Sequence, residues 1–210
     1  MKRKVERVTH MAALSYDEMP AFMAKLRAID DSLHRARALE FTILTAARSG
    51  ETFGATWDEI DFTQRLWTIR RDRMKAGVTH VVPLSDRVMQ ILKEQYDTRC
   101  SQFVFPGHRD NRPMSSTQML RLLTELGVKV TVHGFRSSFR DWAGDKTRFP
   151  RDVIELALAH TVGNATERAY RRGTALEQRR ELMNAWAAYC ERPPQAGNVI
   201  ELERIKAIPA

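Results

Sequence analysis

The stretch Trp57–Leu84 reads WDEIDFTQRLWTIRRDRMKAGVTHVVPL. Three short runs within it, 57–62, 66–69 and 79–84, are rich in β-branched and aromatic residues, and turn-like segments separate them. Runs of this length and composition, divided by turns, are typical of neighbouring antiparallel strands. The stretch therefore predicts a small three-stranded antiparallel sheet. Its second turn is unusually basic and contains Arg70, Arg71, Arg73 and Lys75.

On both sides of this sheet the apolar residues recur at helical spacing. Before it, helices are expected after the capping-box pattern Ser15–Glu18 and over 32–47. After it, helices are expected over 85–96, 115–126, 133–143, 151–160, 165–172 and 176–189. The fold class is therefore mainly α with a small three-stranded antiparallel β-sheet.

The ends of the chain differ from its middle. Residues 1–14 are polar and basic and indicate an N-terminal linker or tail, residues 15–190 one compact domain, and residues 191–210 a C-terminal tail. Within that tail 199–205 alternates weakly, which predicts an isolated strand. A single strand is not stable alone, so we expect it to dock on this domain or to swap onto a neighbouring copy.

Composition excludes several classes of protein. No apolar run approaches the roughly 20 residues of a membrane helix, and no signal peptide opens the chain. Two cysteines, Cys100 and Cys190, cannot form a disulfide framework or a four-cysteine zinc site. The 34 Lys and Arg against 26 Asp and Glu give a formal net charge of +8. That surplus suits a polyanionic partner, but it is also compatible with ordinary solubility.

Two segments each contain a basic residue that could bind phosphate, and each of these residues also has an ordinary structural explanation. Arg48 ends an apolar helix, with Glu51 three residues on. It either complements the helix dipole or grips phosphate oxygens with its planar fork. Lys75 lies in the basic turn. It is either a solvent-exposed charge that protects a sheet edge from pairing, or it reaches into a phosphate site.

Two further segments hold histidines. His133 and Arg136 lie three residues apart at a predicted helix start, which suits an anion but equally a capping histidine with a surface arginine. His160 ends a later helix, and Tyr170 follows ten residues on. A lone tyrosine is usually a half-buried core residue, yet this one is flanked by arginines.

Taken in chain order, Arg48, Lys75, His133-x-x-Arg136, His160 and Tyr170 resemble the active site of the tyrosine recombinase (phage integrase) family. The resemblance extends from about Ser15 to Tyr189. It is strongest to integrases of prophages and genomic islands, through the segments Leu-Ala-His-Thr-Val-Gly-Asn and Glu-Arg-Ala-Tyr. It implies the tyrosine recombinase (DNA breaking–rejoining) catalytic fold. It also implies a site-specific recombinase that cuts one DNA strand, holds it as a 3′-phosphotyrosine and rejoins it during integration or excision.

The resemblance assigns a role to each matched residue. Tyr170 would be the nucleophile, His133 its proton acceptor and Lys75 the general acid for the departing 5′-oxygen. Arg48 and Arg136 would stabilise the charge that builds on the phosphate oxygens.

His160 would hydrogen-bond the scissile phosphate, and Glu51 would orient Arg48 from behind. The crowded basic residues predict a DNA-binding surface formed by Arg70, Arg71, Arg73, Arg168, Arg171 and Arg172.

The family uses no metal or nucleotide, because the phosphotyrosine conserves the bond energy. The sequence accordingly shows no Gly-rich phosphate loop, no metal-spaced carboxylates and no Cys/His cluster.

The implied partners are double-stranded DNA, further copies of the chain in a tetrameric synapse, and an excisionase or a host DNA-bending protein, with no membrane. The expected location is the bacterial cytoplasm, at the nucleoid.

The integrases that this chain resembles are longer proteins, with an arm-binding and a core-binding domain before the catalytic domain. The residues before Ser15 are too few for either. We therefore expect an isolated catalytic domain. Two alternatives stay open at this point: a type IB topoisomerase-like relaxing enzyme with a similar catalytic set, and a non-catalytic DNA-binding remnant.

Overall fold

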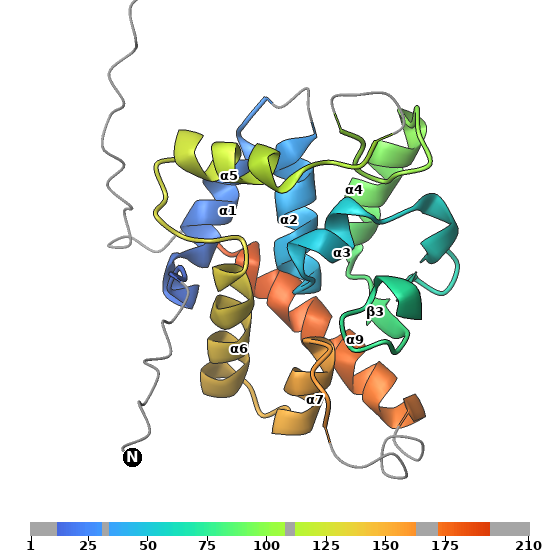
Figure 1. Cartoon of the computed structure of the whole chain (residues 1–210). Helices are drawn as coiled ribbons and strands as arrows, with labels where there is room; N and C mark the ends of the chain where they lie inside the picture. Colours follow the sequence, from blue (N-terminus) through green and yellow to red (C-terminus); the bar gives the residue numbers. More distant parts are fainter. Residues whose placement is uncertain (1–11, 31–33, 108–111, 163–171, 194–210) are drawn as a thin grey trace, which may run out of the picture.

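The computed structural model describes residues 12–30, 34–107, 112–162 and 172–193 (Figure 1). Its helices are α1 (Met19–Arg27), α2 (Arg35–Thr45), α3 (Ser49–Phe53), α4 (Asp86–Asp97), α5 (Ser116–Glu125), α6 (Gly134–Lys146), α7 (Arg151–Ala157) and α9 (Arg172–Cys190). The predicted, mainly helical fold is confirmed. The strand expected at 199–205 and nearly all of the helix expected at 165–172 lie outside the described residues.

The predicted three-stranded antiparallel sheet is also confirmed, but its first strand is shorter than expected because Trp57–Glu59 form a 3₁₀ helix. Strands β1 (Ile60–Asp61), β2 (Leu66–Ile69) and β3 (His80–Pro83) pair antiparallel in the order β1-β2-β3. The first turn forms because the Asp61 carboxylate accepts backbone N–H groups of residues 63 and 64, as turn aspartates commonly do. Between β2 and β3 lies the basic turn, which begins with the 3₁₀ segment η3 (Arg71–Arg73).

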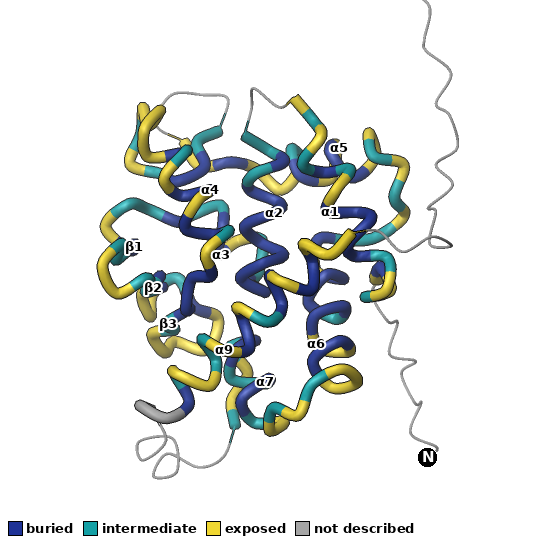
Figure 2. The backbone as a smooth tube through the Cα atoms, turned by 180° about the vertical axis from the view of Figure 1, so that it is seen from behind, coloured by how far each residue is buried: buried dark blue, intermediate teal, exposed yellow. Residues whose placement is uncertain are grey.

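Helix α2 is the centre of the molecule. Every residue from Ala38 to Thr45 is buried, and Figure 2 shows the helix buried along its length. Apolar residues at helical spacing ordinarily bury one face of a helix, but α1, α4, α5, α6 and α9 all pack against this one. Its buried hydroxyls stay hydrogen-bonded, since Thr42 Oγ1 donates to the Ala38 carbonyl and Thr45 Oγ1 donates to the Phe41 carbonyl, both at 2.7 Å.

Helix α9 joins the helical core to the sheet. Its Trp186 packs against Phe139 and Trp142 of α6, and the Trp186 Nε1–H donates to the Ile43 carbonyl of α2 at 2.9 Å. Nearer its start, Arg179 Nη1 donates to the Val81 carbonyl of β3 at 2.7 Å. The helix therefore fixes the sheet relative to α2 and α6.

Helix α7 is shorter than the sequence predicted. The apolar pattern continues to His160, but the helix ends at Ala157 because Ala159 adopts a left-handed conformation with φ of 53°. The chain then reverses, so His160 lies beyond the helix rather than on its last turn. This difference decides where the His160 ring is placed.

The N-terminal segment crosses the start of α6. Leu14, which the sequence places in the linker, is buried, and the Ala12 carbonyl accepts the Thr131 N–H at 3.0 Å. A Cβ added at Gly134 would lie 2.2 Å from the Ala12 carbonyl oxygen, so only glycine permits this crossing. The segment thus holds the helix start that carries His133 and Arg136.

Candidate active site

Arg48 and Glu51 form an ion pair at the turn between α2 and α3. Arg48 Nη1 donates to Glu51 Oε1 at 2.7 Å, and the backbone N–H of Arg48 donates to Oε2 at 2.8 Å. Because α2 already ends at Thr45, Arg48 precedes the first turn of α3 and does not complement the α2 dipole. Glu51 is buried, whereas 28% of the Arg48 side chain is exposed. The carboxylate therefore anchors a guanidinium that still reaches solvent.

Arg136 is buried and clamped between two helix ends. Its Nη1 donates to the Ala46 carbonyl after α2, and its Nη2 donates to the Leu158 carbonyl after α7 at 2.6 Å. Carbonyls at the C-terminal ends of helices carry partial negative charge, which favours a cation there. Burial lowers the pKa of Arg136 to about 10, and the charge of Arg48 acts in the same direction. The guanidinium stays charged near neutral pH and is held from two sides.

The two histidines lie at the start of α6, the helix that carries Arg136, and just beyond the end of α7, whose Leu158 carbonyl Arg136 contacts. His133 immediately precedes α6, three residues before Arg136, and His160 follows Leu158 by two residues. Burial lowers the pKa of His133, and the positive charges of Arg136, Arg48 and His160 lower it further. These interactions place His133 within electrostatic reach of all three groups.

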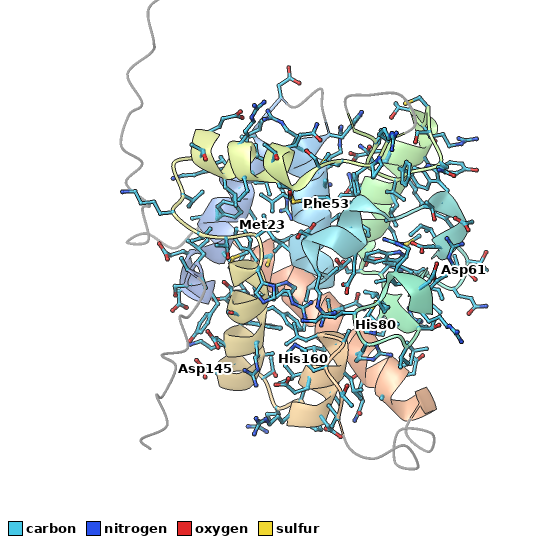
Figure 3. The ribbon with its side chains drawn as sticks, in the orientation of Figure 1. Met23, Phe53, Asp61, His80, Asp145 and His160 are labelled. Carbon is cyan, nitrogen blue, oxygen red and sulfur yellow. The ribbon has the colours of Figure 1, made fainter. Side chains whose placement is uncertain are left out.

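The structure thus brings together Arg48, His133, Arg136 and His160, which we call the basic cluster. Its members come from the start of α3, the start of α6 and the end of α7, so chain segments far apart in sequence converge there. Figure 3 shows His160 in the region between α6, α7 and β3. Two fixed guanidinium groups beside two imidazoles suit a phosphodiester, whose oxygens accept forked hydrogen bonds.

Lys75 lies exposed in the turn between η3 and β3. It makes no hydrogen bond or ion pair with the described residues of the basic cluster. Arg70 and Arg71 in the same turn are also exposed, and Arg70 pairs with Asp58 at 3.1 Å. These three cations face solvent, where a polyanion can reach them.

Arg73 differs from its neighbours in this turn. Its guanidinium points inward, where Nη1 pairs with the buried carboxylate of Glu59 and Nη2 donates to the Glu51 carbonyl at 2.5 Å. The sequence predicted that Arg73 contacts DNA, but the structure gives its fork two partners inside the protein. Since Glu51 also holds Arg48, Arg73 ties the base of the Lys75 turn to α3.

Four predicted residues cannot be placed in the same way. Tyr170, Arg168 and Arg171 lie outside the described residues, and Arg172 is the first residue of α9.

One residue near the cluster, His80, has no signal in the sequence. His80 of β3 is half-buried, hydrogen-bonds the backbone of Ala157 and lies close to Arg179, Arg136 and Arg48. Burial and these three charges lower the pKa of His80 to about 3, so the ring is neutral near pH 7. Its partners come from α3, α6, α7 and α9, and no local spacing could have revealed them.

In the described part of the chain, no three or more His, Cys, Asp and Glu side chains converge to hold a metal ion. Within those same residues, no helix is long and apolar enough to cross a membrane.

Comparison with known proteins gives consistent matches. The phage integrase family matches residues 12–177. The chain is 37% identical over 182 residues to the prophage integrase IntA of Escherichia coli K12, covering 85% of this chain and 44% of that protein. It is 35% identical over 188 residues to the prophage integrase IntZ of the same strain, covering 88% and 46%. The chain therefore spans about half the length of these curated relatives.

Solved structures share the fold at low sequence identity. The integrase from mycobacterium phage Brujita superposes with a TM-score of 0.65 at 18% identity, covering 87% of this chain and 59% of that one. The XerH site-specific recombinase bound to its difH substrate gives a TM-score of 0.59 at 16% identity, covering 80% and 54%. The expected recombinase fold is confirmed by these similarities.

The family match covers well over half of the chain, and it includes four residues of the basic cluster together with Lys75 and Tyr170. The chain belongs to the phage integrase family.

Proposed function

We propose that this chain is the catalytic domain of a site-specific DNA recombinase of the tyrosine type, with residues 15–190 as the catalytic unit. The observation that carries the proposal is the convergence of Arg48, anchored by Glu51, and Arg136, clamped by two helix ends, beside His133 and His160. Both guanidinium groups are held in place before any ligand arrives. Preorganised donors of this kind stabilise charge that develops on oxygen, and each is typically worth about 10²–10³-fold in rate.

In the proposed reaction the Tyr170 hydroxyl attacks the scissile phosphorus. A bond forms between the phenolic oxygen and phosphorus, and the bond from phosphorus to the 5′-oxygen breaks. His133 accepts the phenolic proton, which is needed because a tyrosine hydroxyl ordinarily has a pKa of about 10. Lys75 donates a proton to the departing 5′-oxygen, which leaves as a hydroxyl.

The lowered pKa of His133 supports its role as proton acceptor. A histidine whose charged form is disfavoured is neutral at physiological pH and has a free lone pair. His160, Arg48 and Arg136 share the two non-bridging oxygens of the phosphate as hydrogen-bond acceptors. Reversal of the same steps with a partner strand rejoins the DNA.

DNA is the proposed partner, and the exposed Arg70 and Arg71 contribute to its binding together with Arg168, Arg171 and Arg172. Strand exchange by this chemistry needs several active sites, so we propose a tetrameric synapse formed with further copies. An excisionase or a host DNA-bending protein would set the direction between integration and excision of a prophage or genomic island. The proposed location is the bacterial cytoplasm, at the nucleoid. The C-terminal tail 191–210 is the segment proposed to dock on this domain or to swap onto a neighbouring copy.

The test is a nicked suicide substrate. The short fragment that carries the released 5′-hydroxyl diffuses away, and its loss traps the covalent intermediate. The wild-type chain should form a protein–DNA adduct, and Tyr170→Phe should bind the DNA yet form none. An adduct that persists in Tyr170→Phe contradicts the assignment of the nucleophile. Adduct formation should survive EDTA, and its loss there would contradict the metal-independent mechanism.

Two other outcomes identify the alternatives. Relaxation of any supercoiled plasmid without a specific site would indicate a topoisomerase-like enzyme. A salt-dependent shift of DNA with neither nicking nor adduct would indicate a DNA-binding protein without catalysis.

A further inference from the structure

The end of α7 holds His160 by its backbone. The Ala159 N–H donates to the Leu156 carbonyl at 3.1 Å, and the His160 N–H donates to the Glu155 carbonyl at 2.9 Å. With Ala159 left-handed, these two bonds form a Schellman motif, the common way for a helix to end and reverse the chain. His160 is therefore folded back over the last turn of its own helix.

The same reversal brings the His160 side chain onto Glu155. The His160 Nδ1 lies 2.5 Å from Glu155 Oε2, while Arg140 of α6 holds the other oxygen, Oε1, with Nε at 2.8 Å and Nη2 at 2.6 Å. Glu155 is thus contacted by a different partner at each oxygen. Only 15% of its side chain is exposed, against 42% for His160.

The chemistry of this contact fixes the proton on the ring. Partial burial would raise the pKa of Glu155, but its hydrogen bonds with His160 and Arg140 lower it overall, so the carboxylate is ionised at neutral pH. An ionised carboxylate only accepts hydrogen bonds. The His160 nitrogen that faces it must therefore carry a proton, and that nitrogen is Nδ1.

We propose that Glu155, held by Arg140, is a positioning residue for His160: it binds Nδ1–H and thereby presents Nε2 to the phosphate in the basic cluster. The role rests on the proposed function, since the phosphate is the group that Nε2 would meet. Glu155 itself touches no substrate. When His160 is protonated, the carboxylate also stabilises the imidazolium, which donates from Nε2 to a phosphate oxygen.

The variant Glu155→Gln separates the hydrogen-bonding role of the carboxylate from the space that the side chain fills. Arg140 only donates hydrogen bonds, so it keeps the amide oxygen of Gln at the place of Oε1. The amide NH₂ then faces His160, whose Nδ1 must accept and whose proton must move to Nε2. The variant retains side-chain volume and reverses the tautomer.

The first measurement is the tautomer of His160 from long-range ¹H–¹⁵N correlation spectra of the labelled chain without DNA, with His160→Gln used to assign the signal. In alkaline solution, the wild type should carry its proton on Nδ1 and Glu155→Gln on Nε2. Arg140→Met, which keeps the carboxylate, should retain the wild-type tautomer. The same tautomer in wild type and Glu155→Gln would overturn the proposal.

The second measurement is the rate of adduct formation on the suicide substrate. Hydrogen-bond partners behind metal-binding histidines are typically worth about 10- to 100-fold, and we expect a loss of the same order for Glu155→Gln. Glu181→Gln, which removes the same charge from an exposed site on α9, should react at the wild-type rate. A reversed tautomer with an unchanged rate would overturn the positioning role.

Failure of the proposed function has a different signature. If the wild type forms no adduct while the two tautomers still differ, then the contact is real and the recombinase chemistry is wrong.

Discussion

At the scale of single residues, the same residue type serves opposite purposes within a few positions. Arg70 and Arg73 belong to one basic turn, yet Arg70 is exposed and Arg73 pairs inside the protein with Glu59. Glu59 is almost fully buried and also accepts the Trp67 Nε1–H at 3.1 Å. The sequence places both arginines in a basic turn, but only the position of Glu59 in space decides which one turns inward.

This difference predicts opposite phenotypes for two alanine variants. Arg73→Ala leaves the Glu59 carboxylate buried without its cation, so the free energy of unfolding should fall by about 3 kcal/mol. Arg70→Ala breaks an exposed pair and should cost less than about 1 kcal/mol. Urea denaturation of both variants measures the two losses, and equal losses would contradict the inward role of Arg73.

For DNA binding we expect the opposite order, with a larger loss of affinity in Arg70→Ala than in Arg73→Ala. Arg70→Ala removes a cation that faces solvent, so the slope of log affinity against log salt should become shallower by about 0.9 for each lost phosphate contact. Lys93→Ala, at an exposed position on α4, serves as a charge-matched control. An unchanged slope in Arg70→Ala would remove this residue from the proposed DNA surface.

At the scale of elements, the end of α7 illustrates a limit of periodicity. The apolar pattern predicts a helix to His160, but hydrophobic spacing does not report where backbone hydrogen bonds stop. The helix ends earlier because Ala159 takes a left-handed conformation that is unfavourable for residues with a Cβ. Had the end been placed at Ala157, the Glu155 to His160 spacing would itself have indicated the contact.

The strain at Ala159 predicts a stabilising substitution. The left-handed conformation costs a non-glycine residue roughly 1–2 kcal/mol, and the greater freedom of glycine in the unfolded chain offsets about 0.4–1 kcal/mol. Ala159→Gly should therefore raise the free energy of unfolding by up to about 1 kcal/mol. Ala188→Gly, at an exposed position inside α9, should lower it by about 0.5–1 kcal/mol. Thermal or urea unfolding checks the sign, and a loss in both variants would argue against the left-handed conformation.

At the scale of the whole molecule, His80 lies where the sheet, α6, α7 and α9 meet. Burial and the charges of Arg179, Arg136 and Arg48 lower its pKa to about 3, whereas an unfolded histidine titrates near pH 6.5. Between these pH values the unfolded chain binds a proton that the folded chain does not. The contribution of His80 to stability is therefore complete above about pH 6.5 and is lost progressively as the pH falls.

This linkage predicts acid sensitivity that depends on one residue. On lowering the pH from 7 to 5, His80 should cost the wild type about 2 kcal/mol of unfolding free energy. His80→Gln, which keeps a hydrogen-bond donor but does not titrate, should lack this part of the loss. Urea denaturation of both proteins at the two pH values measures the difference, and parallel pH dependences would contradict the neutral state of the folded His80 ring.

The sequence by itself determined the class of fold, the three-stranded sheet with its turns, and the order Arg48, Lys75, His133, Arg136, His160 and Tyr170. These features are local or follow chain order, because periodicity, turn chemistry and motif spacing act between residues close in sequence. Only the tertiary structure decided that Arg136 is clamped by the ends of α2 and α7, that Arg73 turns inward to Glu59, and that Glu155 faces His160. The physical reason is that burial and charge at these positions come from segments distant in sequence, whose approach follows from packing around α2.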